Sequence, residues 1–200
     1  MKNKKGFYLF LLILLPALIF LFLKGFGKNE FQIPIYYTDG IGGDTLRQVT
    51  CLERNTEQYI VKSPELKAGV TKVIHFERMD GPVLKTRLEE LEKVQDVFYS
   101  HPNVQMTSYL NSASIQTDAI TGYNQRVTFM DQFWHFKELD SASWGNLKYC
   151  GMVMSDLDNR VILVDAKNRI RGYYNIMERE ETDRLILEIR ILQTIDLDNE

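Results

Sequence analysis

The sequence predicts an α/β domain preceded by a hydrophobic helix, and three observations lead to this prediction. A charge-free apolar run lies near the N-terminus, a strand–helix–strand pattern occupies the middle of the chain, and a β-hairpin followed by an amphipathic helix occupies its last third. The 200 residues suffice for one domain and an appendage. We expect a cytoplasmic N-terminus and transmembrane anchor at 1–28, a tether and N-terminal extension at 29–68, and the folded domain at 69–200.

The apolar run extends from Phe7 to Leu23 without a charged residue. As a helix it would span about 25 Å, against a hydrocarbon core of about 30 Å, and the flanking Lys5 and Lys24 can extend to the interfaces. The rival interpretation is a cleaved signal peptide, whose apolar region is usually about 7–15 residues followed by a small-x-small site. Lysine, glycine and phenylalanine follow Leu23 instead. These features favour an uncleaved anchor and leave cleavage as the alternative.

Charge predicts which side of the membrane the domain occupies. Lys2, Lys4 and Lys5 precede the run, and cytoplasmic flanks are enriched in positive charge. We therefore expect a single-pass protein of the inner membrane with its domain in the periplasm or another extracytoplasmic space. Five of the 24 basic residues lie within 1–28, which leaves 19 basic and 27 acidic residues in the rest. This acidic balance argues against nucleic acid as a partner.

The middle of the chain predicts a βαβ unit. Val70–Phe76 is β-branched and apolar, as expected of a buried strand. Asp80 and Pro82 then provide a helix start signal. A second strand is expected at Val104–Leu110, and a right-handed crossover would join the two strands. The buried face of the intervening helix is expected to comprise Leu84, Leu88, Leu91, Val94 and Phe98.

Regions on both sides of this unit are less regular. In the extension, Phe31–Tyr37 and Glu57–Val61 are the strand candidates. After the unit we expect a loose helix at Ser112–Tyr123, strand-like aromatic sequence at Gln125–Phe136 and a short helix at Ser143–Tyr149.

The last third predicts a hairpin of Val161–Asp165 and Arg169–Tyr174, followed by a helix over Glu178–Ile195. Acidic residues in the first turn of this helix match its dipole. Its buried stripe is expected to comprise Leu185, Ile189 and Leu192. A βαβ unit followed by a hairpin and a C-terminal helix is the thioredoxin-like arrangement.

The segment Leu163–Leu192 resembles the C-terminal end of the Sco/SenC family, which typically reads LVD, a short turn, GRIRGxY, an acidic helix start and DRLI. The resemblance extends loosely over 31–195. It implies a membrane-anchored, thioredoxin-fold copper protein that helps to assemble cytochrome c oxidase. The matching residues are Leu163, Val164, Asp165, Arg169, Ile170, Arg171, Gly172, Tyr173, Tyr174, Asp183, Arg184, Leu185 and Ile186.

The copper ligands of that family are missing from this sequence. Its CPxxCP motif falls on a stretch in which Pro82 places Gly81 and Lys85 at the two cysteine positions. A one-residue shift places Asp80 and Leu84 there instead. Because copper(I) prefers thiolates and thiol–disulfide exchange requires them, neither register supports the family's chemistry.

The family's histidine ligand also has no counterpart, because it falls in the segment 155–162, where Leu157 stands. Each histidine of the chain has an ordinary structural explanation: we expect His75 in a strand, His101 in a turn and His135 packed at the edge of the core. The sequence therefore predicts no metal site, with a rearranged copper site as the less favoured reading.

Two cysteines, Cys51 and Cys150, are too far apart in sequence for a CxxC or CxxxC motif. A structural disulfide between them would be permitted outside the cytoplasm. Two unrelated buried thiols and a redox pair remain the alternatives.

The first functional hypothesis is a non-enzymatic binding or assembly factor, without cofactor, beside membrane-bound respiratory proteins. The second is a copper chaperone for cytochrome c oxidase assembly with relocated ligands drawn from Cys51, Cys150 and a histidine. The third is a thiol–disulfide oxidoreductase.

Overall fold

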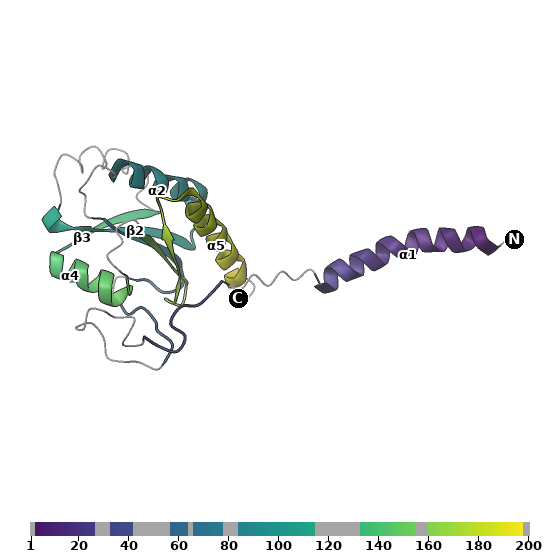
Figure 1. Ribbon diagram of the computed structural model, residues 1–200, viewed down its shortest axis with the longest axis horizontal. Helices are drawn as coiled ribbons and strands as arrows, with labels where there is room; N and C mark the ends of the chain where they lie inside the picture. The colour runs from purple at the N-terminus through teal and green to yellow at the C-terminus, as the bar shows by residue number, and fades with distance from the viewer. Residues whose placement is uncertain are drawn as a thin grey trace. The chain divides into compact units, whose positions relative to one another are not determined.

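In the computed structural model, the described residues are 3–26, 33–41, 57–63, 66–77, 84–114, 133–154 and 160–197. The chain divides into two compact units, residues 1–32 and 33–200. The first contains helix α1, Asn3–Phe26, with Pro16 inside it (Figure 1). Within the described residues, no helix combines the length and the apolar character that crossing a bilayer requires.

The second unit is built on a mixed five-stranded sheet of order β3-β2-β1-β4-β5 (Figure 1). Strands β1, β2 and β3 are parallel, and β4 is antiparallel to both of its neighbours, β1 and β5. The parallel pair β1–β2 with its connecting helix confirms the predicted βαβ unit, and β4–β5 confirms the predicted hairpin. The strands are β1 Thr71–Glu77, β2 Val104–Asn111, β3 Trp134–Leu139, β4 Arg160–Val164 and β5 Ile170–Asn175.

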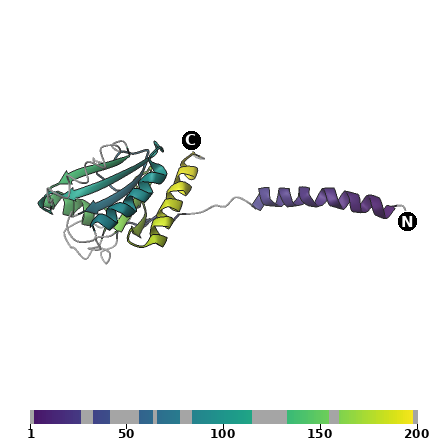
Figure 2. The ribbon, with the colours of Figure 1, turned by 90° about the horizontal axis from the view of Figure 1, so that it is seen from above.

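Two helices, α2 (Leu84–Phe98) and α5 (Arg179–Leu197), lie on one face of the sheet (Figure 2). The other face carries the short helix α4 (Ser141–Gly145) and the π-helical turn η2 (Asn146–Gly151). Side chains along a strand alternate between faces, so the sheet contributes to two separate hydrophobic cores. The predicted helix stripes are confirmed for the side chains that the structure describes, which leaves out Leu84. These side chains are at most 8% exposed: Leu88, Leu91, Val94, Phe98, Leu185, Ile189 and Leu192.

The strand predictions for the N-terminal extension are wrong in its described parts. Residues 33–41 and 57–63 contain no strand beyond an isolated bridge at Ile41. Tyr37 has a φ of 58° and Gly40 a φ of 82°. These left-handed residues turn the chain before it can run beside β5 for any length. The segment instead makes single backbone hydrogen bonds, such as Tyr36 N to Ile170 O at 2.9 Å.

Between β2 and β4, the structure modifies two expectations. The described start of the predicted loose helix is a single 3-10 turn, η1 (Ser112–Ser114), and residues 115–132 lie outside the described residues. The predicted short helix begins earlier, at Ser141, because the Asp140 carboxylate accepts hydrogen bonds from the first turn. The helix then widens into η2, which ends at Gly151.

Candidate functional site

The candidate site lies at the end of the sheet where β1 finishes. In the antiparallel register His75 pairs with Val161, so the end of β1 and the beginning of β4 are neighbours. The chain leaves β1 after Glu77 and enters β4 at Arg160. The two stretches on which the family's ligands would fall, 79–88 and 155–162, therefore connect to the sheet at this same end.

A buried ion pair occupies this end of the sheet. Arg87, on the first turn of α2, donates from Nε to Oε2 of Glu77 at 2.9 Å and from Nη2 to Oε1 at 2.6 Å. Glu77 is 1% exposed and Arg87 is 5% exposed. A bidentate pair of this kind has a defined geometry. It fixes the start of α2 against the end of β1.

His75 lies beside the pair and is completely buried. Its Nε2 is 3.8 Å from Oε2 of Glu77 and has no hydrogen-bond partner among the described residues. Its Nδ1 is 3.4 Å from Oγ of Ser108, which also accepts a hydrogen bond from Nε1 of Trp134 at 2.9 Å. Burial lowers the pKa of His75 to about 4, helped by Arg87 and opposed by Glu77. The ring is therefore neutral around pH 7.

This lowered pKa predicts an acid-dependent loss of stability. The folded pKa is about 4 and the ordinary value 6.5, so the unfolded chain takes up the proton first as the pH falls. Neutral His75 therefore makes its full contribution to the free energy of unfolding above pH 6.5. Between pH 6.5 and pH 4 the free energy of unfolding should fall by about 3 kcal/mol, at 1.36 kcal/mol per pKa unit. Urea unfolding at several pH values should show this loss relative to the His75→Gln variant. Parallel pH curves for the two proteins would contradict it.

A second buried cation, Lys148, lies in η2, on the opposite face of the sheet from α2 and Arg87. It is 1% exposed, and its Nζ lies 4.7 Å from the centroid of the Trp144 ring. Its charge also contributes to lowering the pKa of His75. Nε1 of Trp144 donates to the carbonyl of Tyr109 at 2.9 Å, which fixes the ring under the cation. Val153, just beyond η2, has a φ of 52°, a strained conformation for a β-branched residue.

Among the positions predicted from the family pattern, the structure describes only the side chain of Lys85. Lys85 lies on the outer face of α2 with its side chain 79% exposed, and it pairs with Glu89 at 3.7 Å. Gly81, Asp80 and Leu157 lie outside the described residues, as does the side chain of Leu84. Lys85, the position predicted to correspond to the family's second cysteine, is therefore a solvated lysine one helical turn from Glu89.

Cys150 is disulfide-bonded, and the described residues contain no free cysteine. Cys51, its predicted partner, lies outside the described residues, so the pairing stays a prediction. The hydroxyl of Tyr59 donates to the carbonyls of Cys150 at 3.2 Å and Gly151 at 2.8 Å. These bonds join the N-terminal extension to η2 at the half-cystine.

The histidines do not converge. His75 is in register with Ser108, whereas His135 is in register with Thr107. Successive rows of a sheet point to opposite faces, so these two imidazoles lie on opposite sides of the sheet. His101 lies in the turn after α2, with its ring 5.5 Å from that of Phe98. Within the described ranges, no three histidine, cysteine or acidic side chains are grouped as metal ligands would be.

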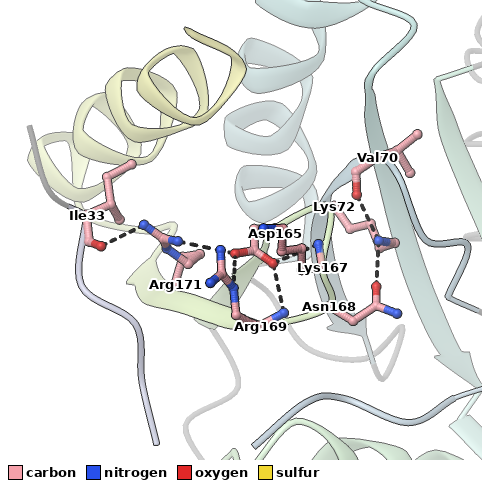
Figure 3. Close-up of polar contacts among 8 residues, drawn as sticks. All are labelled: Ile33, Val70, Lys72, Asp165, Lys167, Asn168, Arg169 and Arg171. Carbon is pink, nitrogen blue, oxygen red and sulfur yellow. Dashed lines mark hydrogen bonds and ion pairs between the residues drawn. The ribbon is translucent and has the colours of Figure 1, made fainter. Parts of the chain in front are cut away.

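The residues that resemble the family most closely form a network at the other end of β1 (Figure 3). Oδ1 of Asp165, which is 2% exposed, accepts the backbone N–H groups of Lys167 at 3.0 Å and Arg169 at 2.9 Å. Its Oδ2 accepts Nε of Arg169 at 2.7 Å and Nη1 of Arg171 at 3.2 Å. The ammonium of Lys72 adds hydrogen bonds to Val70 O and to Asn168 Oδ1, both at 2.8 Å. This motif holds the hairpin turn and the start of β1.

Comparison with solved structures identifies the fold of the second unit. No protein-family model and no curated protein matches the chain. A SCO1/SenC family lipoprotein from Bacillus anthracis str. Ames matches with a TM-score of 0.52 and 12% identity, over 64% of this chain and 83% of that one. BsSco, a member of the Sco family of cytochrome c oxidase assembly proteins, matches with a TM-score of 0.51 and 11% identity, over 63% and 81%.

The second unit thus has the thioredoxin-like α/β fold of solved Sco/SenC structures, which confirms the predicted fold class for this part of the chain and the structural resemblance to that family. At these identities the likeness defines the fold and marks the sequence as divergent.

Proposed function

We propose that this chain is a membrane-anchored, extracytoplasmic Sco/SenC-like protein that has lost the copper and redox site. In this proposal it acts without enzymatic activity, as a binding or assembly factor linked to the biogenesis of a respiratory oxidase. The connection with oxidase assembly is taken from BsSco, to which the second unit is structurally similar.

The observation that carries the proposal is the set of buried side chains at the end of β1. In place of thiols, the described residues there supply a buried glutamate–arginine pair and a neutral buried histidine, Glu77, Arg87 and His75. A carboxylate held by two guanidinium hydrogen bonds is a poor ligand for copper(I), which prefers soft sulfur donors. The exposed Lys85 at a cysteine position of the family pattern supports the same reading.

The anchor is proposed from the sequence, on the charge-free run Phe7–Leu23 with lysines before it. Retention at a membrane would give a domain without copper or redox chemistry a high effective concentration beside membrane-bound partners.

The copper-chaperone alternative requires Cys150 as a thiolate ligand. The disulfide at Cys150 and the separation of His75 and His135 on opposite sheet faces weigh against it. Thiol–disulfide exchange would use the same disulfide, and the 9% exposure of Cys150 makes attack by an external thiolate difficult.

Crosslinking in intact cells, followed by membrane fractionation and identification of partners, tests the proposal. We expect the full chain in carbonate-washed membranes, crosslinked to subunits or assembly factors of a respiratory oxidase. The double variant Leu12→Arg/Leu15→Arg should lose both results, since each arginine at a helix centre costs about 2.5–3.5 kcal/mol of insertion. Leu12→Ala/Leu15→Ala is the matched control. A native chain that leaves the membrane in the wash, or never crosslinks to oxidase-related proteins, would contradict the proposal.

A further inference from the structure

The network around Asp165 also holds a residue that is remote in sequence. Nη2 of Arg171 donates to the backbone carbonyl of Ile33 at 2.6 Å, while Nη1 of the same guanidinium donates to Asp165 at 3.2 Å (Figure 3). Ile33 begins the second compact unit, and its side chain is 6% exposed within the core shared with α2 and α5. The guanidinium therefore joins the hairpin directly to the first residue of the domain.

Two backbone hydrogen bonds hold the following extension to the same hairpin. Tyr36 N donates to Ile170 O at 2.9 Å, and Val61 N donates to Asn168 O at 2.9 Å. Neither bond belongs to a strand ladder, so each can open without disturbing the sheet. The backbone of the extension thus meets 168–171 through a few discrete hydrogen bonds, while Tyr59 and the buried side chains of Ile41 and Val61 hold it elsewhere.

The surroundings of Arg171 indicate that its main role is to fix the position of Ile33 relative to the hairpin. The residue is 7% exposed, and its Nε is buried without a hydrogen-bond partner among the described residues. Replacing a whole buried ion pair by apolar residues is often neutral, whereas removing one partner is costly when the other is left without hydrogen bonds. Without Arg171, the Asp165 carboxylate would keep three hydrogen bonds, from Lys167 N, Arg169 N and Arg169 Nε. A methionine could fill this space, but it could not connect the Asp165 carboxylate with the Ile33 carbonyl. Only the planar fork of arginine holds two acceptors in a defined geometry.

We propose that Asp165 and Arg171 form a clamp that fixes the point at which the N-terminal tether joins the domain. Asp165 is itself held by the turn through Lys167 N and Arg169 N, so the clamp is rigid on the hairpin side. The clamp lies at the start of β1, roughly 20 Å along the strand from Glu77 at about 3.3 Å per residue. Its value to an anchored protein rests on the proposed function: the domain would be held at one end of its sheet, opposite the candidate site.

Hydrogen exchange on the full-length protein in detergent micelles tests the clamp. In Arg171→Met, the amides of 33–41, including Tyr36, should exchange at least ten times faster. Protection of β1 and α5 should stay within a factor of two of the native protein. Arg169→Met is the matched control, because Arg169 also bonds to Asp165 but has no bond to Ile33. It should leave 33–41 within a factor of two of the native rate.

The variant Arg171→Lys provides a second measurement in case the methionine variant does not fold. Its ammonium retains a charge beside Asp165 but lacks the planar fork, so exchange in 33–41 should still accelerate several-fold. Unchanged exchange in 33–41 for either folded variant would overturn the clamp, as would an equal acceleration of β1 and α5. Exchange is measured without requiring α1 to enter a bilayer, so failure of the clamp and failure of the membrane proposal are separate results.

Discussion

Replacing Glu77 by glutamine is expected to lower the free energy of unfolding by about 3–5 kcal/mol, the usual cost of breaking a buried ion pair. The substitution removes the carboxylate that accepts two hydrogen bonds from Arg87 and faces Nε2 of His75. It thereby leaves a guanidinium that is 5% exposed without the charge it faces across this end of the sheet. Urea unfolding at pH 7 measures the effect.

A double-mutant cycle separates the ion pair from general disruption. Arg87→Met alone should also destabilise, because it leaves the buried carboxylate without the guanidinium. Glu77→Gln combined with Arg87→Met should cost clearly less than the sum of the single changes, by about 0.5–3 kcal/mol of coupling. Additive effects, or a loss below about 1 kcal/mol for Glu77→Gln, would show that the pair does not hold α2 to β1.

Restoring the missing ligands should create a copper site. The variant Gly81→Cys/Lys85→Cys/Leu157→His places two thiols and an imidazole at the positions given by the family pattern. We expect it to bind one copper(I) per chain at micromolar affinity or tighter, because thiolates are the preferred ligands of copper(I). Titration against a competing chelator under reducing conditions measures the gain.

The shifted-register variant Asp80→Cys/Leu84→Cys, with the same Leu157→His change, is the control. It contains the same number of sulfur and nitrogen ligands but should bind copper(I) at least ten times more weakly. Tighter binding by the shifted variant would overturn the alignment on Pro82. Absence of binding in both would show that this end of the sheet does not preserve the geometry of the family.

Most of the second unit could be predicted because its signals are local and repeated. β1 contains a run of β-branched residues and α2 a stripe of leucines, so in each element several residues independently indicate burial. The extension offered no such redundancy. Its path depends on a left-handed φ at Tyr37 and on single bonds to the hairpin, which no periodic pattern encodes.

The candidate site could be predicted only in part. The absence of cysteines at Gly81 and Lys85 is visible in the sequence. The cluster of His75, Glu77, Arg87 and Ser108 at the end of β1 is not, because Ser108 lies 33 positions after His75 and meets it through the pairing of β1 with β2. A charged residue at the end of an apolar strand normally indicates solvent, whereas Glu77 is 1% exposed. The single signal available was the closeness of Glu77 and Arg87 in sequence, across the strand-to-helix connection.

Copper(I) titration of the native full-length chain is the most direct test of the central claim. Purified protein in detergent, under reducing conditions and against a competing chelator, should retain no stoichiometric copper at micromolar free concentrations. The restored-ligand variant serves as the positive control in the same assay. Binding of one copper(I) per native chain at micromolar affinity or tighter would contradict the claim that this domain has lost the chemistry of the family it resembles.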